Sequence, residues 1–184
     1  KASLNANTGH VYFYLKQYAK SIEFHQRAIQ FYEVLKDTSS VVGVMATMCE
    51  IYKMLPDDAK TLEYCNRTLK IIKGMHKTKI VGEEIVVCRT VAEVYRKQKH
   101  YATALFYSKK GIDMAKQIDD KTEYSYSQKE LGLCLLALAL DSSFTQLHSI
   151  PHADSAAHRA VYEAIVPHET TAKLRLAQSY LMQS

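Results

Sequence analysis

Apolar side chains recur along most of the chain at the spacing of an amphipathic helix. In the middle of the chain, Val87, Val91 and Val94 follow an i, i+4, i+7 spacing, which places them on one helical face. A polar corner follows at residues 97–100, and a second apolar stripe runs from Ala104 to Ala115. The pattern therefore predicts two helices joined by a short corner.

This pair of helices is repeated along the chain. Tyr12, Tyr52 and Tyr95 hold the same place in the first helix and lie 40 and 43 residues apart, and a fourth register at residues 131–135 follows 40 residues later. Each second helix carries small residues seven positions apart, which let a neighbouring helix approach closely. These residues are Ser21 and Ala28, Thr61 and Thr68, and Ala104 and Gly111. The sequence predicts repeats at about residues 1–37, 38–77, 78–120 and 121–140 onward.

One such helix pair cannot bury its apolar face alone, whereas stacked neighbours bury it on both sides. We therefore expect an all-α fold, an α-solenoid of stacked antiparallel helix pairs with one concave surface lined by the first helix of each pair. Helix starts are expected at Thr38–Ser40, Thr78 and Thr122, whose hydroxyls can cap a helix. Pro56 falls in the corner between the two helices of the second repeat.

Residues 141–184 depart from the repeat pattern. Pro151 and Pro167 bracket a predicted helix at residues 154–166, and the apolar residues between Leu174 and Leu181 predict a last helix. We expect this segment to hold the divergent remainder of the fourth repeat and C-terminal capping helices.

The repeated residues resemble those of the tetratricopeptide repeat (TPR) family. The first repeat keeps the family's small, aromatic and alanine positions at Gly9, Tyr12, Tyr18 and Ala28, and the third keeps them at Ala92, Tyr95, Tyr101 and Ala104. Repeats of about 40 residues, longer than the family's usual ones, are similar to those of Pins/LGN-type adaptors, kinesin light chains and Rap/PlcR-type peptide receptors. The resemblance implies a TPR-like superhelix.

The resemblance also implies a peptide-binding groove, because the first helices of this family direct fixed positions into the concave face. The residues that it places there are Ser3, Ala6, His10, Phe13 and Tyr14 in the first repeat, Gly43, Ala46, Glu50, Lys53 and Met54 in the second, Val86, Arg89, Glu93, Arg96 and Lys97 in the third, and Tyr126, Lys129, Leu133, Leu136 and Ala137 in the fourth. The centre of this lining is basic. Since arginine can hold a carboxylate with two parallel hydrogen bonds, acidic side chains are suitable partners.

Charge and cysteine content limit the kinds of partner and the cellular compartment that we expect for the chain. The net charge is +5, from 24 basic and 19 acidic side chains that are interspersed, which argues against direct nucleic-acid binding and slightly favours acidic partners. No apolar run approaches the length of a membrane span, so no membrane insertion is expected. The four cysteines form no Cys-x-x-Cys pair and fall at apolar positions of the repeat, which favours a reducing, cytoplasmic compartment. The chain starts at Lys1, and we expect it to be part of a longer protein.

The sequence carries no motif of a known catalytic site. It lacks a nucleophile elbow, a phosphate-binding glycine loop and a His-Glu-x-x-His zinc motif. Four histidines crowd the C-terminal segment, namely His148, His152, His158 and His168, but Pro151 interrupts their helical spacing, and we interpret them as loop residues. We therefore expect no enzyme activity, no metal and no cofactor.

These observations favour a protein–protein interaction module, an adaptor or scaffold that binds a peptide or helical segment of a partner in its groove. Two alternatives stay open. The chain could be a structural subunit of a stable multiprotein assembly, or a peptide-sensing regulatory domain fused to a DNA-binding or catalytic domain. The oligomeric state is left open.

Overall fold

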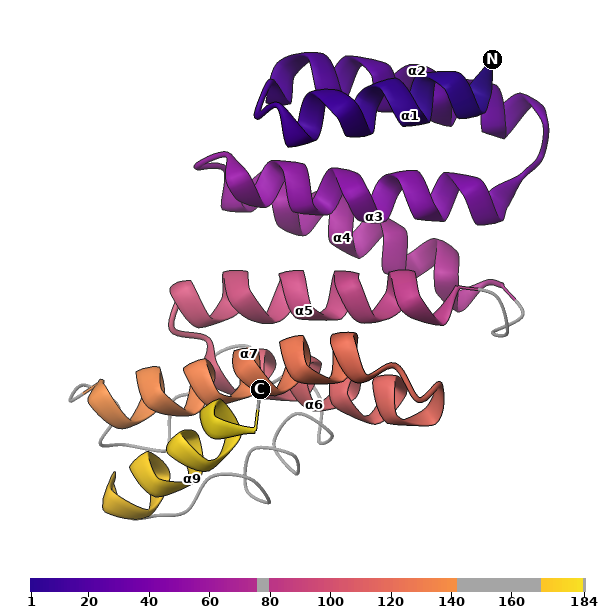
Figure 1. The fold of residues 1–184 in the computed structure, drawn as a ribbon. Helices are drawn as coiled ribbons and strands as arrows, with labels where there is room; N and C mark the ends of the chain where they lie inside the picture. The colour runs from indigo at the N-terminus through magenta and orange to yellow at the C-terminus, as the bar shows by residue number, and fades with distance from the viewer. Residues whose placement is uncertain (76–79, 142–169, 184) are drawn as a thin grey trace. The chain divides into compact units, whose positions relative to one another are not determined.

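The described part of the chain is all-helical. The structure, a computed structural model, describes residues 1–75, 80–141 and 170–183, and no strand occurs among them. The helices are α1 (Ala2–Tyr14), α2 (Tyr18–Val34), α3 (Thr38–Met54), α4 (Asp58–Lys73), α5 (Val81–Lys97), α6 (Tyr101–Gln117), α7 (Lys121–Leu140) and α9 (Thr170–Met182) (Figure 1). The predicted all-α fold is confirmed.

The contacts divide the chain into two compact units, residues 1–87 and 88–184, so that α5 begins in the first unit and ends in the second. Within each unit, successive helices pack on their neighbours, as in a helical-repeat solenoid. The two units are described one at a time.

In the first unit, α1 and α2 form an antiparallel pair and α3 packs on α2 before it pairs with α4 (Figure 1). The two helices of the first pair approach closely at Gly9, whose carbonyl oxygen accepts a 2.8 Å hydrogen bond from the Ser21 hydroxyl. The small residues Ser21, Ala28, Thr61 and Thr68 are fully buried. The predicted role of small residues in close helix packing is therefore confirmed in this unit.

In the second unit, α7 packs on α6 on one side and on α9 on the other. Leu105, Leu131 and Leu135 form the centre of its core and are fully buried. A methyl group at Gly132 would lie 2.8 Å from Leu181 Cγ, so the absence of a side chain at this position lets α9 approach α7. The last helix predicted from the apolar residues near the C-terminus is present as α9.

The repeated tyrosines pack on the second helix of their own pair. Tyr12 stacks on Phe24 with ring centroids 5.3 Å apart, and Tyr52 lies against Tyr64 at 4.7 Å. In both cases the partner ring comes 12 residues later in the chain. Tyr95 packs against the core of the second unit. The repeat pattern in the sequence thus marks aromatic contacts within helix pairs.

The helix starts differ from those predicted. Aspartates cap three of them: Asp37 accepts from the Ser40 backbone N–H, Asp57 from that of Lys60, and Asp120 from those of Thr122 and Glu123. The predicted caps at Thr38–Ser40 and Thr122 lie inside the first turns of α3 and α7. The prediction of those caps was wrong because an aspartate stands just before each of them, and its carboxylate reaches the free N–H groups of the first turn. The predicted cap Thr78 lies outside the described residues.

Four helices end in the same way, with a residue in the left-handed region that glycine usually occupies. Lys16, Lys36, Lys99 and Asp119 have φ between 53° and 63°. After each of them, the next backbone N–H bonds back to the carbonyl of the third-last helical residue, as in the 2.9 Å bond from Gln17 to Tyr12. This is the Schellman motif, built here without glycine.

Within the described ranges, every helix falls short of the combined length and hydrophobicity that a membrane span requires. The helix predicted at residues 154–166 and the histidines His148, His152, His158 and His168 lie outside the described residues.

Candidate protein-binding site

A pocket of about 330 Å³ opens between α5 and α7 in the second unit. Seven residues line it, and all of them except Glu130 are groove residues predicted from the TPR resemblance. The lining consists of Arg89, Glu93 and Arg96 from α5 and Tyr126, Lys129, Glu130 and Leu133 from α7. We call this the α5–α7 pocket.

Helical spacing explains why these side chains meet. On α5, Arg89, Glu93 and Arg96 follow an i, i+4, i+7 pattern, so they share one face. On α7, Tyr126 and Leu133 are likewise seven residues apart and share the face that looks toward the pocket. Each helix therefore presents one row of side chains to the same space.

Two ion pairs join the rows. Arg96 Nε lies 2.7 Å from Glu130 Oε1, and Arg89 Nε lies 3.7 Å from Glu123 Oε2. In both pairs the acid follows its arginine by 34 residues. A constant offset over two helical turns means that α5 and α7 run in the same direction at this place, as the first helices of successive repeats do.

The Arg96–Glu130 pair is the shorter of the two and holds the more deeply buried acid. The Arg96 side chain is 20% exposed and that of Glu130 only 7%. Burial raises the pKa of the Glu130 carboxyl above its usual range, while the hydrogen bond and charge of Arg96 oppose that rise. The pair therefore holds the wall of the pocket in place. If either side chain moved away, the other charge would be left unpaired where little water can solvate it.

Lys129 differs from the arginines beside it. Glu93 pairs with Lys97 at 3.0 Å, so each acid at the pocket has a basic neighbour. Lys129 is exposed and has no ion pair with any residue that the structure describes. It is the cation of this pocket that remains uncompensated.

The pocket also has apolar surface. The Arg89 guanidinium lies 5.3 Å from the centre of the Tyr126 ring, a distance at which the ring face attracts a cation. Tyr126 is half exposed, and Leu133 is partly buried beside it. A ligand that combines a carboxylate with an aliphatic or aromatic portion suits this lining.

The thiol behind the pocket is not a nucleophile. Cys134 Sγ lies 3.6 Å from Glu130 Oε1, and the residue is fully buried. Burial, followed by the charge of Glu130, raises the pKa of this thiol well above its usual value. A thiol of this kind stays protonated and unreactive.

The predicted groove residues of the first unit have different surroundings from one another. His10 Nε2 contacts Thr47 Oγ1 at 3.2 Å. Phe13 packs against the buried cluster of Met48 and Ile51, so it contributes to the core. Tyr14 is 80% exposed. Glu50 and Lys53 are partly buried on α3, and both interact with other groups.

Glu130 is the member of the pocket that the sequence did not reveal. It stands between Lys129 and the apolar run that begins at Leu131, where a charged residue would ordinarily face solvent. The signal available in the sequence is the repeated arginine–glutamate offset of 34 residues, because Arg89 and Arg96 both have an acid at that distance.

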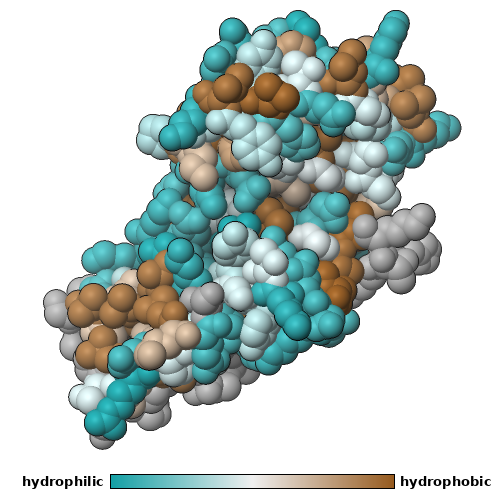
Figure 2. All heavy atoms as spheres, in the orientation of Figure 1, coloured by the Kyte–Doolittle hydropathy of each residue, from teal (hydrophilic) through white to brown (hydrophobic). Residues whose placement is uncertain are grey.

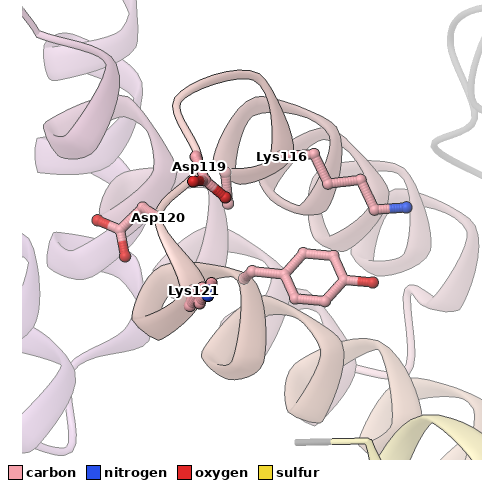
Figure 3. A pocket seen from close by; sticks show the side chains of 6 residues that line it. Lys116, Asp119, Asp120 and Lys121 are labelled. Carbon is pink, nitrogen blue, oxygen red and sulfur yellow. The ribbon is translucent and has the colours of Figure 1, made fainter.

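A second hollow, of about 260 Å³, lies at the corner between α6 and α7 (Figure 3). Lys116, Asp119, Asp120 and Lys121 line it together with Tyr124 and Ala115. Its carboxylate at Asp120 caps α7, and Lys116 Nζ lies 5.3 Å from the centre of the Tyr124 ring. These groups stabilise the turn between α6 and α7. The two lysines and two aspartates that line the hollow balance in charge.

Comparison with known proteins adds no assignment: no family model matches the chain, and no curated protein matches it significantly. Among the residues that the structure describes, no three His, Cys, Asp or Glu side chains are arranged to hold a metal ion.

Proposed function

We propose that this chain is a protein-binding module of the TPR type, an adaptor that holds an acidic segment of a partner protein on the face of its first helices. The observation that carries the proposal is the uncompensated Lys129 in the α5–α7 pocket, beside two arginines that glutamates hold in place. The role is binding and not catalysis, since the pocket residues lack a nucleophile with a base to activate it.

The charges of the pocket favour one carboxylate. Arg89, Arg96 and Lys97 balance Glu123, Glu130 and Glu93, so Lys129 is the one cation in excess. The Nε–H group of Arg96 donates to Glu130. The other N–H groups of the guanidinium can donate to a second acceptor. A glutamate or aspartate of the partner can therefore pair with Lys129 without displacing an existing ion pair of the pocket.

We place this function in a reducing compartment such as the cytoplasm. Cys49, Cys65, Cys88 and Cys134 are all buried and free, which suits a protein whose cysteines serve as small apolar core residues.

A comparison of peptide pools tests the proposal. Three pools of short random peptides differ only in a central Glu, Gln or Lys, and their binding to the chain is measured by fluorescence anisotropy. We expect the Glu pool to bind about three- to tenfold more tightly than the Gln pool, because a charge-assisted hydrogen bond is worth about 1 kcal/mol at a partly exposed site. The Lys pool should bind most weakly.

The variant Lys129→Ala should remove most of the preference for Glu. Lys70→Ala is the matched control, since Lys70 is also an exposed helical lysine, on α4, and is not among the residues that line the pocket. Equal binding of the three pools to the unmodified chain would contradict the proposal and favour a structural subunit whose contacts lie elsewhere.

A further inference from the structure

One wall of the α5–α7 pocket is a row of three side chains on α7. Tyr126, Lys129 and Leu133 line the pocket at an i, i+3, i+7 spacing, which places them on one helical face. Measured along the helix axis, Lys129 lies about 4.5 Å from Tyr126 and about 6 Å from Leu133. An aromatic and an aliphatic side chain therefore stand one helical turn before and one turn after the lysine to which we assign the partner's carboxylate. We call these three residues the α7 row.

The apolar members of the α7 row are accessible to a ligand. Tyr126 is 50% exposed, and Leu133 is partly buried. In the second unit, Figure 2 shows hydrophilic surface interrupted by separate hydrophobic patches. A partner's acid that pairs with Lys129 thus comes within reach of apolar surface on both sides along the row.

The opposite wall, on α5, consists of charged residues that are already balanced. Arg89, Glu93 and Arg96 each have a partner of opposite charge. They also span two helical turns, like the α7 row. The α5 wall therefore borders a ligand along its whole length, while the α7 row supplies the free positive charge and the apolar contacts.

The lining offers little to the backbone of an extended peptide. An extended segment leaves its N–H and C=O groups open, and those that a protein surface covers need partners. The seven residues that line the pocket include no asparagine, glutamine, serine or threonine, the amide and aliphatic hydroxyl side chains that both donate and accept. A helix needs no such partners, because it satisfies its own backbone groups except at its ends.

The spacing of the α7 row also favours a helix over a strand. On a ligand helix, residues three and four positions apart share a face and lie about 4.5 and 6 Å apart along the axis. A helix that runs along α7 in either direction thus meets all three positions of the row in register. In a strand, the residues that share a face are two positions apart, at about 6.6 Å. Three of them span about 13 Å, whereas the α7 row spans about 10.5 Å.

We propose that the α5–α7 pocket selects an amphipathic α-helix of a partner protein, in which an acidic residue has one apolar residue three positions away on one side and another four positions away on the other. The acid pairs with Lys129, and the apolar residues lie against Tyr126 and Leu133. This inference rests on the proposed function and names the class of segment that the pocket binds. An acidic segment that binds as a strand, or without the apolar pair, would satisfy the proposed function alone.

Three synthetic peptides of equal composition separate the two conformations. Each carries a central Glu and two leucines in a host of alanine and glutamine. The leucines stand three before and four after the Glu in the first peptide, four before and three after in the second, and two before and two after in the third. On a helix, the third peptide turns its leucines away from the Glu, whereas on a strand it places all three side chains on one face.

Fluorescence anisotropy with the full 184-residue chain measures the affinity of each peptide. We expect the better of the first two peptides to bind about tenfold more tightly than the third, because two leucines then bury part of their apolar surface on the α7 row. A proline two positions after the Glu faces away on a helix and breaks it, so it should remove this advantage. Equal or tighter binding of the third peptide would overturn the proposal.

Variants of the chain locate the contact. The double variant Tyr126→Ala/Leu133→Ala should bring the better helical peptide within about twofold of the third peptide, because the apolar contacts are then lost. The matched control Phe31→Ala/Leu35→Ala also removes an exposed aromatic ring and an exposed leucine, and neither of them lines the pocket. It should keep the full advantage. Equal loss in both double variants would overturn the proposal.

The outcomes distinguish this inference from the proposed function. If the random pools show a preference for Glu over Gln that depends on Lys129, but the three designed peptides bind alike, the proposed function stands and the inference is wrong. If neither the pools nor the designed peptides distinguish Glu from Gln, the proposed function fails, and the inference fails with it.

Discussion

Arg96 Nε of α5 lies 2.7 Å from Glu130 Oε1 of α7, in a pair of which both side chains are mostly buried. The bond joins the first helices of two successive repeats at the wall of the pocket to which we assign partner binding. It also sets a limit on how that pocket can be tested. Reversing the charge of Arg96 would strand Glu130, so the exposed Lys129 is the residue whose substitution reports on binding alone.

We expect Arg96→Gln to destabilise the second unit. The substitution leaves Glu130 as an unpaired charge that is 7% exposed, and breaking such a pair costs about 3–5 kcal/mol. The free energy of unfolding in urea measures this loss. Lys97→Gln is the control, because the Lys97 side chain is 45% exposed and loss of its pair with Glu93 should cost less than about 1 kcal/mol. If the double variant Arg96→Gln/Glu130→Gln is no more stable than Arg96→Gln, the stranded charge is not the cause.

Gly132 should be intolerant of a side chain. An alanine methyl there would lie 2.8 Å from Leu181 Cγ and 3.3 Å from the Ala177 carbonyl oxygen, so α9 would have to move. We expect Gly132→Ala to cost about 1–3 kcal/mol in spite of the better helix propensity of alanine. Gly43→Ala is the control, since its methyl would meet only Glu83 Oε1, at 3.9 Å, and should stabilise α3 by about 0.5–1 kcal/mol. Urea unfolding measures both, and equal effects would contradict the close approach of α9.

The stability of the first unit should fall in mild acid because of His25. This histidine is fully buried, and burial lowers its pKa; the backbone hydrogen bond with Ser21 raises it, and the charge of the nearby His10 lowers it further. As the pH falls through about 6.5, His25 takes up a proton in the unfolded chain but does not yet do so in the folded chain. Stability is therefore constant above that pH and is lost below it, by at most about 1.4 kcal/mol per pH unit.

Thermal unfolding of the first unit, measured between pH 7.5 and pH 5, tests whether its stability falls as the pH is lowered. His25→Gln should flatten the profile, because the histidine whose pKa burial lowers is then absent. Parallel profiles for the two proteins would show that another group is responsible.

Glycine should be preferred at the left-handed helix ends. Lys36 has φ 55°, a conformation that costs a non-glycine residue about 1 kcal/mol. We expect Lys36→Gly to raise the free energy of unfolding by about 0.5–1 kcal/mol. Lys70→Gly, in the middle of α4, should lower it by a similar amount. A loss of stability at both positions would mean that the Lys36 side chain makes a contact worth more than the strain.

The sequence predicted those features that depend on repeated, local relationships. Ser21 was placed in close packing by its position in the repeat, and its hydroxyl donates to the Gly9 carbonyl oxygen of the neighbouring helix. The TPR resemblance placed Arg89 and Arg96 on the concave face, and the two residues line one pocket.

What the sequence did not predict depends on how particular helices meet. Glu130 stands at the edge of an apolar run in the sequence. It is buried because α7 packs on its neighbouring helices. Phe13 lies against Met48 because α3 arrives at that point of α1. Asp37 caps α3 through a local bond that competes with the Thr38–Ser40 hydroxyls, and spacing alone does not rank two neighbouring caps.

The most direct test of the account is a charge swap at the α5–α7 pocket. Lys129→Glu should invert the preference of the chain, so that the peptide pool with a central Lys binds more tightly than the pool with a central Glu, while Lys70→Glu, which changes the net charge equally, leaves the original order in place. If Lys129→Glu and Lys70→Glu weaken the Glu pool to the same extent, only the overall charge matters, and the pocket is not where a partner binds.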